Sequence, residues 1–269
     1  MHLLYCDESN LEHRPGDFLL YGGVVVPSDQ AAALSTRIEE IRVNAGVSAD
    51  ANVKFNPPVP PLDHAGFRDL KQAIIEAAIQ HDCKFLAYVV LHDLAGDPNT
   101  ARLYGINTIC YHFHCILNRI GGAGMVLVDR FNDDANAVDG HMRQKMWEGV
   151  RLPHRPRPSR LTNIIGFHYS AIGQAHFTSL SDILVGSIRF AINAHCRGQT
   201  NLRAGAQNLL QIINPLFFRE EGQDGVPDLG FHFSPMNVRV PRFHEQYVSL
   251  QDFLREAGVA SSQNITNNG

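Results

Sequence analysis

The sequence has no run of eighteen apolar residues, and no basic start followed by an apolar stretch with a small-residue cleavage site. We therefore expect neither a membrane span nor a signal peptide, and we expect a cytoplasmic protein. Charge is also scarce, because charged residues make up 19% of the 269 positions and the formal net charge is −4. Any contact with nucleic acid therefore has to use a local basic patch.

Recognisable metal-binding pairs are missing as well. The five cysteines are scattered without a Cys-x-x-Cys pair, and the fourteen histidines include no His-x-x-x-His pair with a Glu between. Such cysteines are typical of buried free thiols in a reducing compartment. In CYHFHC, residues 110–115, Cys110 and His114 share one face of a helix, but the four side chains do not converge. We expect a buried or half-buried helix face there, with a zinc site as the alternative.

The sequence does contain an alternation of strand and helix patterns, and 44% of it is apolar, enough for a sizeable core. Strands are predicted at 2–6, 18–26, 83–92, 123–131 and 161–171. Helices are predicted at 29–44, 62–82, 99–119, 137–150 and 177–196. This order predicts an α/β domain over residues 1–198, a mixed five-stranded sheet with helices on both faces.

The periodicity is weaker beyond residue 198. The segments 209–219 and 230–240 have strand-like pieces, and 249–258 is typical of a short helix. We expect residues 199–260 to form a C-terminal extension that packs on the core and covers a sheet edge. The polar residues 261–269 are expected to be a flexible tail.

Acidic residues follow two of the predicted strands and begin the last core helix. Asp7 and Glu8 end the first strand, Asp129 ends the fourth, and Asp182 lies near the start of the helix at 177–196. If the first and fourth strands are neighbours, Asp7 and Asp129 meet at the edge where open α/β sheets bind ligands. Convergent carboxylates are what hard divalent cations require. The alternatives are ordinary ones: Asp182 suits the helix dipole, and Glu8 is a solvated side chain.

Five segments carry a family resemblance: YCDESN, LLYGGVVVP, VKF, VLVDR and TSLSDILVGSI. Together they resemble the family catalogued as domain of unknown function 3800, placed among the ribonuclease H-like folds, over roughly residues 1–195. The residues that match the family pattern are Asp7, Glu8, Ser9, Lys54, Asp129 and Asp182. Asn10 stands where the family usually has glycine, and Val53 stands where an acidic residue is expected.

The resemblance implies a ribonuclease H-like fold and metal-dependent hydrolysis of phosphodiester bonds in nucleic acid, with Mg²⁺ or Mn²⁺ as the cofactor. It implies that Asp7 bridges two ions, that Asp129 and Asp182 each hold one, and that Glu8 is a further ligand or an outer-shell base. Lys54 offsets charge on the phosphorane, unless it is an ordinary surface lysine. The alternative function is a non-catalytic ribonuclease H-like module that binds nucleic acid or a protein partner.

A stiff basic loop, RLPHRPRPSR at 151–160, supplies positive charge that the whole chain lacks. Its prolines hold an extended segment, and arginine matches the geometry of phosphate oxygens. We expect the loop to bind a phosphate backbone through Arg151, Arg155, Arg157 and Arg160, with a solvated surface loop as the alternative. Arg130, next to Asp129, is a substrate clamp or the partner of that carboxylate in an ion pair. The sequence leaves the oligomeric state open.

Overall fold

The computed structural model describes residues 1–129, 137–151 and 156–268. Along the chain it contains β1 (His2–Ser9), β2 (Phe18–Pro27), α1 (Ala31–Asn44), α2 (His64–Gln80), β3 (Lys84–Leu91), α3 (His92–Ala95), α4 (Pro98–Arg119), β4 (Gly124–Asp129), α5 (Ala137–Glu148), β5 (Ile164–Ser170), α6 (His176–Cys196), α7 (Arg203–Ile213), β6 (Phe231–Ser234) and α8 (Pro241–Glu256). The predicted α/β class is confirmed. No helix in these ranges is long and apolar enough to cross a membrane.

The strands form one mixed sheet. Its order in the described part of the chain is β5-β4-β1-β2-β3-β6, where β1, β2 and β3 are antiparallel neighbours and the other pairs are parallel. The predicted count of five strands is therefore wrong by one, because β6 of the C-terminal region pairs with β3. A sheet edge leaves backbone N–H and C=O groups without partners, and this short strand satisfies them along β3.

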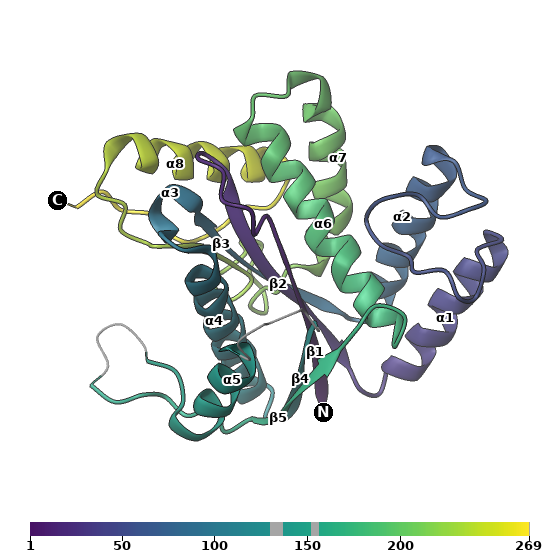
Figure 1. Cartoon of the computed structure of the whole chain (residues 1–269), viewed down its shortest axis with the longest axis horizontal. Helices are drawn as coiled ribbons and strands as arrows, with labels where there is room; N and C mark the ends of the chain where they lie inside the picture. The colour runs from purple at the N-terminus through teal and green to yellow at the C-terminus, as the bar shows by residue number, and fades with distance from the viewer. Residues whose placement is uncertain (130–136, 152–155, 269) are drawn as a thin grey trace.

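Helices cover both faces of the sheet (Figure 1). One core lies beneath α1, α2, α6, α7 and α8, and the other lies beneath α4 and α5. Along β1 the side chains alternate, since Tyr5 belongs to the first core whereas Leu4 and Cys6 belong to the second. The same alternation turns the next two residues, Asp7 and Glu8, to opposite faces.

The C-terminal region is more helical than its sequence pattern indicates. The strand-like segment 209–219 is wrong as a prediction, because α7 continues to Ile213 and a 3₁₀ turn follows at Asn214–Leu216. Ala206, Leu210 and Ile213 are buried at a spacing of four and three residues, which is the helical period. The predicted helix at 249–258 is present, but α8 begins eight residues earlier at Pro241, a residue suited to the first helical turn.

The end of the chain is held against β6. The Gln263 side chain accepts a hydrogen bond from Phe233 N–H at 2.7 Å and donates one to Phe233 O at 2.9 Å. Farther along, Thr266 N–H donates to Met236 O at 2.8 Å, and Ile265 is buried. Residues 261–268, expected to be a flexible tail, therefore contribute contacts to the outer edge of the sheet.

Candidate functional site

Asp7 and Asp129 lie side by side at the carboxyl ends of two neighbouring parallel strands. Cys6 of β1 is paired with Val128 of β4, so the next residue on each strand is one of the two aspartates. The predicted neighbourhood of the first and fourth strands is thus confirmed. Both aspartates face α6, since Cys6 and Val128 pack into the core on the opposite side of the sheet.

Helix α6 brings the third aspartate, Asp182, to the same region. The Ser181 hydroxyl donates to Tyr5 O of β1 at 3.1 Å, which fixes this turn of α6 against the strand. The next residue, Asp182, accepts a hydrogen bond at Oδ2 from the Phe55 N–H at 2.6 Å. One turn later, Gly186 makes room for this contact, because a Cβ there would lie 2.4 Å from the Phe55 Cβ. Asp182 is therefore held by the proline-rich connector between α1 and α2.

A small cavity separates the two strand-end aspartates from α6. Its volume is about 10 Å³, and its polar lining consists of Asp7, Asp129, Ser170, Thr178 and Ser181. A space of this size admits about one water molecule. Because the lining offers carboxylate and hydroxyl oxygens, its chemistry fits a hard divalent cation such as Mg²⁺ or Mn²⁺.

The carboxylates also interact electrostatically. Burial raises the pKa of Asp7 well above its ordinary value, and the negative charges of Glu8, Asp182 and Asp129 raise it further. One hydrogen bond opposes this, since the Glu8 N–H donates to Asp7 Oδ1 at 2.8 Å. Yet among the residues that the structure describes, no three His, Cys, Asp or Glu side chains gather closely enough to hold a metal ion. The acids are near enough to repel one another without forming a closed ligand set.

Glu8, predicted as a further ligand, lies on the other face of the sheet. Its Oε1 is 3.9 Å from Arg102 Nη1 of α4, and the two side chains are 10% and 9% exposed. Burial raises the pKa of Glu8 to about 7, although the Arg102 charge lowers it and Asp129 adds to the rise. Glu8 thus pairs with an arginine of α4 and does not line the small cavity.

The two lysines of this region differ from expectation. Lys54, predicted to offset charge, is exposed on the connector. Lys71 of α2, which the sequence reasoning missed, donates to Phe55 O at 3.0 Å, and its Nζ lies 4.3 Å from the centre of the Phe55 ring. Burial lowers the pKa of Lys71, and the charge of Asp182 opposes that change. Its only sequence signal is its position one helical turn after Phe67, whose ring it also contacts at 4.7 Å.

The basic loop begins and ends at the opposite end of the strands from Asp129. Its base is closed by Val150 and Ser159, which exchange backbone hydrogen bonds of 2.9 and 2.8 Å. Five residues later β5 begins at Ile164, which is paired with the first residue of β4, whereas Asp129 is the last. At the rise of a strand, this separation is about 16 Å.

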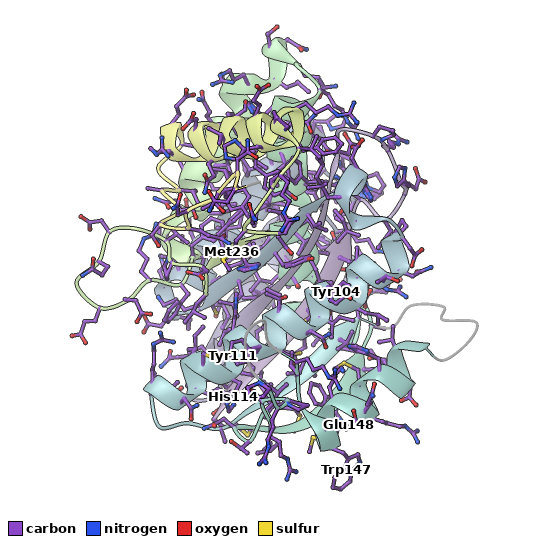
Figure 2. All side chains as sticks on the ribbon, turned by 90° about the vertical axis from the view of Figure 1, so that its left-hand side faces the viewer. Tyr104, Tyr111, His114, Trp147, Glu148 and Met236 are labelled. Carbon is purple, nitrogen blue, oxygen red and sulfur yellow. The ribbon has the colours of Figure 1, made fainter. Side chains whose placement is uncertain are left out.

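The described arginines of the loop lie in solvent. Those with described positions, all exposed, are Arg151, Arg157 and Arg160. Arg130 and Arg155, the other predicted substrate ligands, lie outside the described residues. Figure 2 shows Trp147, near the end of α5, pointing away from the body of the protein, and its side chain is 75% exposed. Neither Trp147 nor the described arginines Arg151, Arg157 and Arg160 line the small cavity.

The CYHFHC segment is part of α4 and faces the core. Cys110, His112 and His114 are all buried, which confirms the prediction of a buried helix face. Burial lowers the pKa of His112 to about 3, with a smaller effect from His232, whose ring centre is 5.2 Å away. These imidazoles are therefore neutral at physiological pH and contribute packing rather than charge.

A scan against protein-family models found no match, and searches of curated proteins and of solved structures found none either.

Proposed function

We propose that this chain is a divalent-metal-dependent phosphodiester hydrolase of the ribonuclease H-like type, akin to the domain of unknown function 3800 family, that acts on nucleic acid. One observation carries the proposal: Asp7 and Asp129 end two neighbouring strands and line one small cavity against α6. Burial raises the pKa of Asp7 there, and the negative charges of Glu8, Asp182 and Asp129 raise it further. Buried carboxylates that repel one another destabilise the fold, and a divalent cation between them removes that repulsion.

Asp7 and Asp129 would hold the cation at the small cavity, and Asp182 would add negative charge near it. A bound Mg²⁺ or Mn²⁺ supplies Lewis acidity that activates a water molecule and stabilises the leaving oxygen of a phosphodiester. The protein itself orients the acids. The Phe55 N–H donates a hydrogen bond to Asp182 at 2.6 Å. Lys71 donates a hydrogen bond to the carbonyl of Phe55, which keeps a positive charge near Asp182.

The test is thermal unfolding across a millimolar range of Mg²⁺ and of Mn²⁺. Because a ligand that binds only the folded form stabilises it, saturation at ~100 times Kd adds about 2.7 kcal/mol. We expect this rise in the wild type and its loss in Asp129→Asn. Asp69→Asn, at a position where the side chain is 69% exposed, is the matched control and keeps the rise. A wild-type protein that stays folded but does not respond to either metal contradicts the proposal.

A second candidate function follows from a different observation. Within residues 1–129, 137–151 and 156–268 the acids do not gather into a group that could hold a metal. A non-catalytic ribonuclease H-like module that binds nucleic acid or a protein partner has no need of such a group. Nucleic-acid binding that is insensitive to Mg²⁺ and Mn²⁺, with no cleavage of DNA or RNA oligonucleotides, distinguishes this module from the hydrolase.

A further inference from the structure

A larger cavity, of about 510 Å³, is lined in part by Phe55, the residue whose N–H holds Asp182. Three segments form it: the loop after β1, the connector before α2 and the second half of α6. Its lining includes Asn10, Phe55, Asn56, Arg189, Phe190 and Asn193. Its volume is that of an ordinary small-molecule site, whereas the small cavity between Asp7 and Asp129 admits only a water or an ion.

The cavity is connected to the carboxylates by the chain itself. The N–H of Phe55 holds Asp182, and the same residue lines the cavity. Arg189 follows Asp182 by seven residues on α6, which is two turns and about 10 Å along the same helix face. Asn10 follows Asp7 by three residues at the end of β1. Arg189, in the lining of the cavity, is thus about two helical turns from Asp182 on α6.

Arg189 brings an uncompensated positive charge to the cavity. The other arginines in the lining are paired, Arg14 with Glu12 at 3.1 Å and Arg197 with the buried Asp17 at 3.0 Å. In the described part of the chain Arg189 makes no ion pair, and its guanidinium carbon lies 5.9 Å from the centre of the Phe55 ring. In a protein of net charge −4, this is a local cationic site of the kind that binds a phosphate.

The walls of the cavity are held in place and include aromatic surface. Asn10 and Asn193 exchange side-chain hydrogen bonds of 2.9 and 3.3 Å, which fix the loop after β1 against α6. Beside them, the rings of Phe55 and half-buried Phe190 have centres 6.3 Å apart. Proteins that bind single strands combine a positive groove with aromatic rings on which bases stack.

We propose that this cavity binds one nucleotide of a single-stranded nucleic acid, with its phosphate on Arg189 and its base against Phe190. A phosphodiester of the same strand would then reach Asp7, Asp129 and Asp182. This last step rests on the hydrolase function proposed above. A single strand is the ligand because a base can enter the cavity only when it is not stacked in a duplex.

The test measures binding without chemistry. Fluorescence anisotropy is recorded with labelled ten-nucleotide single-stranded DNA and RNA in buffer that contains EDTA, at several salt concentrations. Arg189→Gln is expected to weaken binding by about tenfold, and to reduce the slope of log Kd against log salt by about 0.7, the value for one phosphate contact on a single strand. Arg189→Lys keeps the charge and restores the slope. Arg37→Gln, which removes the same charge from α1, is the matched control and leaves binding within about twofold.

A second variant tests the aromatic wall. Phe190→Leu keeps an apolar side chain in the core but removes the ring, so we expect about fivefold weaker binding with an unchanged salt slope. Stacking and charge are thereby measured separately. Far-ultraviolet circular dichroism of each variant establishes that the loss is not one of folding.

Several results overturn the inference. They are wild-type protein that does not bind the single strands, Arg189→Gln that binds as tightly as Arg37→Gln, and a duplex of the same sequence that binds equally well with the same dependence on Arg189. Failure of the hydrolase function gives a different pattern: Arg189-dependent binding without any metal-dependent cleavage. If Arg189→Gln cleaves as fast as the wild type, the hydrolase function is supported and the nucleotide site at Arg189 is contradicted.

Discussion

The two faces of the sheet at the carboxyl end of β1 differ in the charges that surround a buried acid. Asp7 and Glu8 are consecutive, and burial is the largest cause of the raised pKa of each. The negative charge of Glu8 itself raises the pKa of Asp7 further, and so do the charges of Asp182 and Asp129 on the α6 face. On the α4 face, Glu8 has Arg102 at 3.9 Å, which lowers its pKa.

Burial and sequence position therefore do not by themselves determine the role of an acid; its charged neighbours matter as well. A carboxylate with a protein cation beside it, such as Glu8, has part of the cost of its burial offset by that cation. A carboxylate surrounded by others, such as Asp7, remains in electrostatic conflict until a cation arrives. The following predictions test whether the two faces are as different as their neighbours indicate.

The largest expected effect is on cleavage. Asp7→Asn removes a carboxylate from the small cavity, so we expect the initial rate of oligonucleotide cleavage in Mn²⁺ to fall by at least ~100-fold. Glu8→Gln on the opposite face is expected to keep the rate within about fivefold of the wild type. An equal loss in both variants contradicts the separation, since it indicates that the two acids act in one site.

The next effect is on the pH dependence of stability. The pKa of Glu8 is about 7 in the folded protein against an ordinary 4.5, so the folded form binds more protons between these values. Its contribution therefore makes the unfolding free energy fall as pH rises from 4.5 to 7, by about 3 kcal/mol over the whole window. Urea denaturation in EDTA at pH 5, 6, 7 and 8 measures this, and Glu8→Gln is expected to lose that part of the dependence.

Other groups titrate in the same window, so the comparison is between variants. The pKa values of His112 and His232 are lowered to about 3 and about 4, and these residues make the unfolding free energy rise as pH increases toward 6.5. Their contribution is common to wild type and Glu8→Gln and cancels in the difference. Parallel curves for the two proteins contradict the role assigned to burial at Glu8.

Two helix glycines allow the effect of packing to be measured separately from the effect on metal binding. At Gly186 of α6 a Cβ would lie 2.4 Å from the Phe55 Cβ, and at Gly105 of α4 one would lie 2.7 Å from the Tyr21 Cβ. We expect alanine at either position to destabilise the fold by about 1–3 kcal/mol through overpacking. Only Gly186→Ala disturbs the contact of Phe55 with Asp182, so it alone should weaken the stabilisation by Mn²⁺. Equal metal responses contradict that link.

The smallest effect distinguishes the two lysines. Lys71→Met removes the hydrogen bond to Phe55 O on the α6 face, and we expect a loss of about 1 kcal/mol of unfolding free energy. Lys54→Met changes an exposed side chain and is expected to stay within about 0.5 kcal/mol of the wild type. Urea denaturation at pH 7 measures both. A larger loss for Lys54→Met reverses the assignment made from the structure.

Most of the helices and strands, and the ends of the strands, could be predicted from the local sequence pattern. Period-two and helical patterns located the elements of the first 198 residues except the short helix α3, and the acids Asp7 and Asp129 stood at the ends of the patterns for β1 and β4. These features depend on neighbours a few residues apart, which is why they are legible in a linear chain. The C-terminal region was less legible because β6 has only four residues, and because a short apolar window at 209–219 does not distinguish a strand from α7.

Which side chains contact one another depends on the tertiary structure. Glu8 was separated from Asp7 by the alternation of a strand with cores on both faces, and Lys71 replaced Lys54 because α2 packs its lysine against the connector. The basic loop was placed at the far end of β4 and β5, while Arg189 came to line a cavity beside the acids. Each of these depends on strand order and helix packing between residues far apart in the chain, and local periodicity carries no information on such pairings.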